Sequence, residues 1–171
     1  MALIAMTTSD TVDHVSDLDP CKVKTKTLRD PADHTKGSDE VVTIKEGATV
    51  FKLRPLDVFL MGYIYDNAST LSGKQGSDDI GIHTRVNQTN IEAVRHGLAG
   101  FVNFTDRAGG VVVMKTQKAV VNGRSYDVAH DTIMNMFGVK LMQELAEQVK
   151  KISEVQPAEE KNSVEASLQS A

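Results

Sequence analysis

The chain has 171 residues, of which 40% are hydrophobic and 25% are charged, values that suit one ordinary soluble domain with tails. Its 23 acidic residues outnumber the 19 lysines and arginines, so the formal net charge is -4 and no overall basic field would attract nucleic acid or an anionic membrane. No apolar run approaches the ~18 residues of a membrane span, and the short apolar start "MALIAM" lacks the basic region of a signal peptide. We therefore expect a cytosolic protein with no nucleic-acid partner and no membrane partner.

Both ends of the chain are polar and predict flexible segments. Residues 1–39 mix Thr, Asp, Lys and His with scattered apolar residues and two prolines, and they would not bury enough surface to fold independently. The single cysteine, Cys21, has no disulfide partner in the chain, which fits a reducing compartment. Residues 156–171 are polar and poor in bulky side chains, so we predict a disordered acidic tail. An α+β domain is expected between these segments, over residues 40–155.

The predicted domain begins at Val41. Apolar residues alternate on both sides of Glu46-Gly47 in "VVTIKEGATVFKL", which predicts a β-hairpin with its turn at that pair. Pro55 then opens "PLDVFLMGYIYDN", whose apolar residues surround nearly the whole circumference of a helix. This helix is too short to span a bilayer, so its cover must come from the domain core or from another protein chain. The Gly-, Ser- and Asp-rich segment 69–81 predicts a mobile loop.

The stretch "NIEAVRHGLAGFVNF" predicts a helix over residues 90–102 with two unlike faces. Thr89 is its expected N-cap. One face is bulky, whereas Ala93, Gly97 and Gly100 lie on nearly the opposite side. Glycine costs roughly 1 kcal/mol in a helix interior, so the small-residue face predicts close approach by another helix, from this chain or from a second copy. The bulky face is expected to pack against the sheet.

A second hairpin and a last helix complete the predicted α+β fold, a small antiparallel sheet of two hairpins packed with about three helices. The β-branched segment "VVVMKTQKAVVNGRSYDV" contains Asn122-Gly123, a pair that suits the tight turn between antiparallel strands. Asp131 is the expected N-cap of the last helix, and Gly138 is expected to bend or split it. An apolar stripe follows this helix at Ile133, Phe137, Leu141, Leu145, Val149 and Ile152.

The sequence contains no catalytic, metal-binding or cofactor-binding motif. Its five histidines are scattered, without the His-x-x-x-His or Cys-x-x-Cys spacing that aims ligands at one metal. Asp78, Asp79 and His83 would meet an ion across the predicted loop, but acidic residues in such loops are ordinarily turn formers. "GKQGS" lacks the Gly-Lys-[Ser/Thr] end of a P-loop, and there is no Gly-x-Ser-x-Gly. We therefore predict no catalytic residue, no cofactor and no metal, and a binding protein rather than an enzyme.

Three stretches, "VVTIKEGATVFKLRPLDVFLMGYI", "NIEAVRHGLAGFVNFTDRAGG" and "NGRSYDVAHDTIMNMFGVKLMQELAEQVKKISEVQPAEEKNS", cover most of residues 41–163. They give a hairpin that runs into an Arg-Pro-Leu helix start, a Gly-Leu helix that closes on Asn-Phe, and a final helix with an acidic tail. In this order of segments the chain resembles the small assembly chaperones encoded among the tail genes of tailed bacteriophages. The N-terminal arm departs from the family pattern and leaves part of the function open.

The resemblance implies a role in binding within the cytoplasm of the infected host. In that family the chaperone keeps the long tape measure protein soluble and helps to recruit tail tube subunits, often with a longer form made by translational frameshift. Apolar surface on the helix over 56–65, the small-residue face and the adaptable methionines Met61, Met134, Met136 and Met142 would serve this role. The predicted partner-binding residues are Leu56, Phe59, Leu60, Tyr63, Ala93, Gly97, Gly100 and Met142. Taken singly, Leu56, Phe59 and Tyr63 are more typical of a core than of an interface.

Two other classes of protein remain open. One is a virion structural protein, such as a capsid decoration or head-tail joining subunit, in which the N-terminal arm would order against neighbouring subunits. The other is a regulatory nucleic-acid binder, which the acidic balance of the chain argues against. The small-residue face also leaves a homo-oligomer open.

Overall fold

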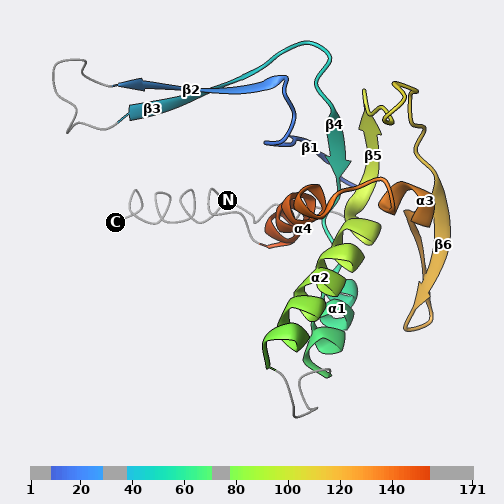
Figure 1. The fold of residues 1–171 in the computed structure, drawn as a ribbon. Helices are drawn as coiled ribbons and strands as arrows, with labels where there is room; N and C mark the ends of the chain where they lie inside the picture. Colours follow the sequence, from blue (N-terminus) through green and yellow to red (C-terminus); the bar gives the residue numbers. More distant parts are fainter. Residues whose placement is uncertain (1–8, 29–37, 71–77, 155–171) are drawn as a thin grey trace, which may run out of the picture.

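The computed structural model describes residues 9–28, 38–70 and 78–154, which form an α+β fold (Figure 1). Three strands form an antiparallel sheet in the order β1-β4-β5, and two separate ribbons are made by β2 with β3 and by β6 with β7. The strands are β1 (Val12–Val15), β2 (Lys22–Leu28), β3 (Ser38–Ile44), β4 (Val50–Leu53), β5 (Leu98–Val102), β6 (Thr116–Val121) and β7 (Arg124–Ala129). The helices are α1 (Val58–Thr70), α2 (Asp78–Gly97), α3 (Asp131–Met134) and α4 (Val139–Ser153). The predicted α+β class is confirmed.

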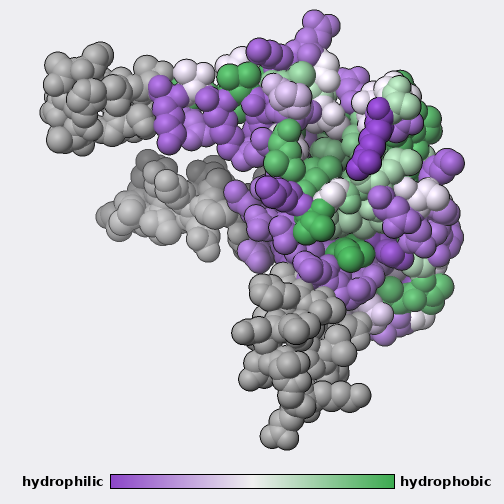
Figure 2. All heavy atoms as spheres, viewed as in Figure 1, coloured by the Kyte–Doolittle hydropathy of each residue, from purple (hydrophilic) through white to green (hydrophobic). Residues whose placement is uncertain are grey.

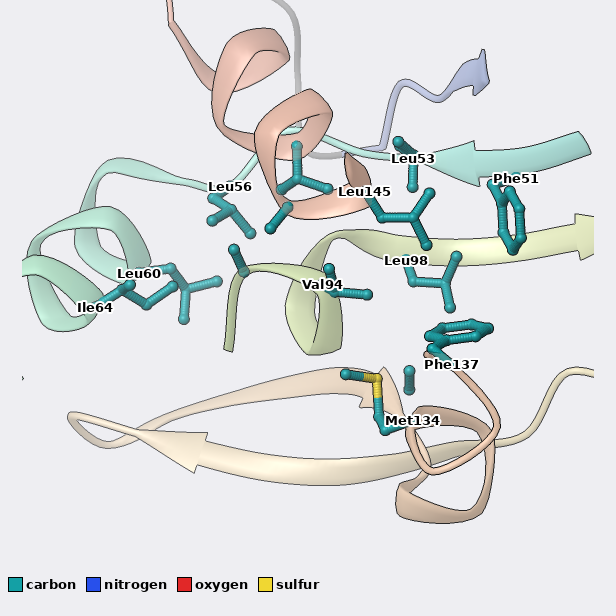
Figure 3. Close-up of a cluster of buried hydrophobic side chains, with 14 of the residues drawn as sticks. Phe51, Leu53, Leu56, Leu60, Ile64, Val94, Leu98, Met134, Phe137 and Leu145 are labelled. Carbon is teal, nitrogen blue, oxygen red and sulfur yellow. The ribbon is translucent and has the colours of Figure 1, made fainter. Parts of the chain in front are cut away.

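The core forms around β4, the central strand of the three-stranded sheet. Phe51 and Leu53 alternate with half-buried residues along this strand, so both point to the same face, where they are almost fully buried. The ring of Phe51 lies against Phe104 and Phe137, with centroids 5.8 and 5.9 Å away. Burial of one side chain of this size stabilises the fold by roughly 1.5–3 kcal/mol. The cluster draws on α1, α2, α3 and α4 and on β4, β5, β6 and β7. Figure 3 shows its side chains, among them Leu56, Leu60, Ile64, Val94, Leu98, Met134 and Leu145.

The described part of the predicted flexible arm forms two strands. β1 pairs with β4, from Val12 opposite Leu53 to Val15 opposite Val50, and β2 pairs with β3. Over these residues the segment predicted as a flexible arm forms strands. Few apolar side chains mark the two strands because much of their stabilisation comes from backbone hydrogen bonds and polar contacts, which leave no hydrophobic pattern in the sequence.

The predicted hairpin over residues 41–53 is also wrong. Its two halves belong to different sheets, β3 to a ribbon with β2 and β4 to the three-stranded sheet. Gly47 does adopt a turn conformation, with φ of 87°. This turn leads the chain out of the ribbon and into the sheet, where strands distant in sequence occupy both sides of β4.

Hydrogen bonds to one carboxylate hold β1 and the following turn against α4. Ser16 Oγ donates to Glu144 Oε2 at 2.6 Å, and the backbone N–H of Asp17 donates to Oε1 at 2.7 Å. His14 Nε2 lies 3.0 Å from the same Oε1. Burial alone would raise the pKa of Glu144, but these hydrogen bonds outweigh it and lower the pKa from its usual value. The N-terminal segment is thus anchored through a charged, partly buried side chain.

Replacement of Glu144 by alanine should lower the free energy of unfolding by about 1–3 kcal/mol at pH 7, because the donors on Ser16 and Asp17 would lose their partner. Urea denaturation of the full chain measures this loss. The matched control is Glu147→Ala on the same helix, where the side chain is exposed and a change within about 0.5 kcal/mol is expected. Equal effects of the two substitutions would show that the anchor contributes nothing.

The predicted helix over residues 90–102 is confirmed in part. α2 begins at Asp78 and ends at Gly97, so Thr89 lies inside the helix instead of at its N-cap, and residues 98–102 form β5. The predicted loop over 69–81 overlaps the end of α1 and the start of α2, and its residues 71–77 lie outside the described chain.

The second hairpin and the break in the last helix are confirmed. Asn122 and Gly123 adopt φ of 48° and 78°, the pair of positive values that a tight turn between β6 and β7 requires. Gly138 separates α3 from α4 and is the N-cap residue of α4. His130, not Asp131, caps α3, because its side chain accepts from the Thr132 backbone N–H. The predicted stripe is buried at Ile133, Phe137, Leu145, Val149 and Ile152 and half-buried at Leu141.

Candidate partner-binding site

Two hollows meet at the end of α3, where its C-cap residue Asn135 lines both of them. The first hollow, which we call the apolar groove, has a volume of about 330 Å³. Its lining comes from α2, α3, α4 and the residues that join the last two: Asn87, Asn90, Ile91, Met134, Asn135, Phe137, Val139, Met142 and Gln143. The second, the loop hollow, measures about 520 Å³ and is lined by Phe104, Thr105, Asp106, Arg107, Ala108, Asn135 and Met136.

The floor of the apolar groove is fixed by the core, whereas its mouth is open. Met134 and Phe137 are buried, and the ring of Phe137 packs against Phe51 of the central sheet. Val139 is 68% exposed at the start of α4, and Met142 follows it by three residues on the same helix face. The helix break at Gly138 thus places α4 so that an apolar side chain stands at the mouth while another lines the groove.

The polar residues of the apolar groove are uncharged amides. Asn87, Asn135 and Gln143 are exposed at its rim, and Asn90 is buried, with its Oδ1 accepting a hydrogen bond of 2.8 Å from Lys150 Nζ. No acidic or basic side chain lines the groove within the described chain. Such a lining favours an apolar peptide segment over a charged ligand, and the flexible thioether of Met142 lets the groove adjust to different side chains.

The loop hollow is shaped by a turn that Asp106 closes. Its Oδ1 accepts hydrogen bonds from the backbone N–H groups of Ala108 and Gly110, at 2.9 and 2.8 Å. Met136 is 49% exposed between this turn and the apolar groove. Asp106 therefore has a local structural role in this turn. The loop hollow and the apolar groove share one feature, a methionine in the lining: Met136 in the first and Met142 in the second.

The structure separates the predicted partner-binding residues. Met142 lines the apolar groove, and Phe59 is 53% exposed on α1, where the guanidinium of Arg124 lies 3.6 Å from its ring centroid. Tyr63 is half-buried against the core, and Gly100 is half-buried on β5. The remaining four are buried inside this chain and offer no surface to a partner: Leu56, Leu60, Ala93 and Gly97.

Most of the groove lining was not among the predicted residues. Ile91, Phe137 and Val139 look like ordinary core positions in the sequence, and the rim amides look like ordinary surface positions. The signal that pointed here is the set of methionines on either side of Gly138, which the sequence singles out as adaptable.

A small polar pocket of about 170 Å³ is lined by residues of the β4–α1 connection, by His96 in the last turn of α2 and by residues of β7. The Arg54 backbone N–H donates to Gly97 O at 2.8 Å, its Nε donates to His96 O at 2.9 Å, and its guanidinium also donates to Asp127 O. Tyr126 Oη donates to Asp57 Oδ2 at 3.1 Å. These bonds tie the β4–α1 connection to α2 and β7, so the pocket is part of the scaffold.

His96 is the unusual member of this polar pocket, because it is 3% exposed and its Nδ1 has no hydrogen-bond partner. Burial, together with the charges of Arg54 and Arg95, lowers the pKa of His96 to about 4. The imidazole is therefore neutral at pH 7.

Comparison of the chain with protein-family models, with curated proteins and with solved structures found no match. Over residues 9–28, 38–70 and 78–154, no three His, Cys, Asp or Glu side chains gather closely enough to hold a metal ion. In the same ranges no helix is both long enough and apolar enough to cross a membrane. The fold and its site define a small α+β protein with a methionine-lined apolar groove.

Proposed function

We propose that this protein is a phage tail assembly chaperone that binds apolar segments of the tape measure protein and aids tail tube assembly in the host cytoplasm. The observation that carries the proposal is the apolar groove, which has a buried floor, an exposed mouth and an uncharged rim. The order of sequence segments, which resembles that of the family, supports it independently.

Further apolar surface accompanies the groove. Exposed hydrophobic side chains lie on several elements, and Figure 2 shows them as green patches between hydrophilic residues. A chaperone that shields a long apolar partner needs several weak contact points rather than one deep pocket, since each contact must release when the tail assembles. These exposed residues include Val58, Phe59, Val102, Val111, Val113, Val120, Met136 and Val139.

Co-expression with a phage tape measure protein tests the proposal. We expect the tape measure protein to stay in the soluble fraction with the wild-type chain and to sediment without it. Val139→Glu should reduce the soluble fraction several-fold, because it puts a charge at the mouth of the groove, where the partner's apolar segment would have to desolvate it.

The matched control is Lys140→Glu, which puts the same side chain on the neighbouring, exposed position of α4 outside the groove. Both changes are on the surface, so both variants should fold, as circular dichroism would verify. A soluble fraction that is independent of the wild-type chain would overturn the proposed function. Equal losses with the two variants would exclude the groove as the binding site.

A virion structural protein is the second candidate, and the β2–β3 ribbon favours it. This ribbon stands away from the rest of the molecule (Figure 1), as an arm that contacts a neighbouring subunit would. Mass spectrometry of purified particles separates the two functions: a chaperone is absent from mature virions, whereas a structural subunit is present at fixed stoichiometry.

A further inference from the structure

The apolar groove and the loop hollow adjoin, so one partner segment can occupy both. Asn135, the C-cap residue of α3, lines both of them. Met142 lines the first, and Met136, which is 49% exposed, lines the second. A segment that fills the two hollows must therefore pass over Asn135. The chemistry of such a segment rests on the proposed function, which gives the apolar groove a polypeptide partner.

Three side-chain amides stand at the rim of the apolar groove without a hydrogen-bond partner. Asn87, Asn135 and Gln143 are exposed, and none of their amides bonds to another residue in the part of the chain that the structure describes. A side-chain amide has one carbonyl acceptor and two N–H donors, which complement the N–H and C=O groups of a peptide backbone. A helix pairs these backbone groups internally, whereas an extended segment leaves them free. The rim therefore favours an extended segment.

The loop hollow differs from the apolar groove in having two charged side chains, Asp106 and Arg107. Asp106 uses its Oδ1 within the turn, where it accepts from the backbone N–H groups of Ala108 and Gly110. Arg107 is exposed, and among the described residues no carboxylate forms an ion pair with its guanidinium. The charge without a partner at this end of the site is therefore positive, and it complements a carboxylate.

We propose that the two hollows bind one extended peptide segment, whose apolar side chain fills the apolar groove and whose acidic side chain pairs with Arg107. Alternate side chains of an extended segment point the same way, roughly 7 Å apart, so adjoining hollows receive residues i and i+2. The backbone between them bonds to the Asn135 amide. In this mode of recognition the main-chain hydrogen bonds give affinity and the side-chain pockets give specificity. The partner motif is thus an apolar residue with Asp or Glu at the alternate position.

Selection from a displayed library of random peptides, with the purified full-length protein as bait, tests this motif. The wild-type chain should enrich sequences that carry an apolar residue and an acidic residue at alternate positions. Arg107→Glu should enrich sequences with Lys or Arg in place of the acidic residue, because the charge at that end of the site is reversed. The matched control is Lys140→Glu, the same change of charge at an exposed position outside both hollows, which should keep the wild-type preference.

Fluorescence anisotropy with a synthetic peptide of the wild-type consensus measures the two contacts separately. Replacement of the acidic residue by lysine should weaken binding to the wild-type chain about fivefold, and Arg107→Glu should restore it. Asn135→Ala should weaken binding of the consensus peptide about fivefold, because a backbone group of the peptide loses its partner. Asn135 and Arg107 are both exposed, and far-UV circular dichroism verifies that the variants are folded.

Three results would overturn the proposal. They are no enrichment by the wild-type chain, apolar residues enriched three or four positions apart as on one face of a helix, and the wild-type preference unchanged in Arg107→Glu. The co-expression assay fails independently of this one. If Val139→Glu lowers the soluble fraction while Arg107→Glu keeps the wild-type preference, the proposed function stands and the motif is wrong. If the motif depends on Arg107 while the tape measure protein stays insoluble, the motif stands and the proposed function is wrong.

Discussion

Replacement of Gly97 by leucine should destabilise the protein by about 3 kcal/mol or more, the upper end of what overpacking of a core produces. A Cβ atom at Gly97 would lie 2.5 and 2.6 Å from the two γ-carbons of Val149, well inside contact distance. Val149 is itself fully buried on α4, and its β-branched side chain strongly prefers one rotamer in a helix. The added side chain must therefore push α2 and α4 apart.

Thermal and urea denaturation of the two proteins measure this effect, and Gly97→Ala should fall between leucine and wild type because the clash begins at Cβ. The control is Gly62→Ala in α1, where a Cβ meets nothing within 4 Å. Alanine there should stabilise the helix by about 0.5–1 kcal/mol. An unchanged melting temperature and oligomeric state in Gly97→Leu would refute the close helix contact.

The contact at Gly97 shows what a local pattern predicts well. The small-residue face predicts a second helix at this point, and α4 of the same chain supplies it. The pattern does not reveal where α2 ends, because Gly100 lies on β5. A Cβ atom added at Gly100 would meet only Cδ of Lys52, at 4.0 Å, so no helix packs closely there. Apolar residues such as Leu98 and Phe101 fit both the helical and the strand periodicity. The segment forms a strand because it pairs with β4.

Pairing between distant segments limits prediction most strongly in the N-terminal third. β1 is polar on average, and its position depends on β4 for backbone hydrogen bonds and on Glu144, far along the chain, for its anchor. Neither partner is visible from the composition of residues 1–39. The β6–β7 hairpin, by contrast, depends on a turn within the segment itself, at Asn122-Gly123, and is predicted correctly.

The sequence predicts which kind of side chain lines the candidate site but not where the site lies. Methionine content near the chain's last helix indicates an adaptable surface, and Met142 does line the apolar groove. The floor and rim come from α2, α3 and α4 together, so their residues become a site only when the helices pack. The apolar helix over 56–65 serves both roles: Leu60 and Ile64 of α1 lie in the core, as does Leu56 just before it, whereas Phe59 is 53% exposed.

His96 should make the protein less stable as the pH falls from 6.5 toward 4. Its folded-state pKa is about 4, whereas the ordinary value is 6.5, so within this window the unfolded chain binds a proton that the folded chain does not. The free energy of unfolding therefore falls with decreasing pH, by at most about 3 kcal/mol for His96, and the loss levels off below its folded-state pKa. Above pH 6.5 this residue contributes no pH dependence.

Urea denaturation of the wild type and His96→Gln across pH 4 to 7 isolates this contribution, because carboxylates such as Glu144 titrate in both proteins and cancel in the difference. The variant should be less stable at pH 7, since a glutamine amide has more hydrogen-bonding positions than a neutral imidazole in a site where Nδ1 already lacks a partner, but its stability should fall less steeply toward pH 4. Parallel curves would mean that His96 accepts its proton without unfolding, through a partner such as Glu92, whose Oε2 lies 3.8 Å from Nε2. The size of the difference thus reports whether burial and the charges of Arg54 and Arg95 outweigh the nearby carboxylates around this ring.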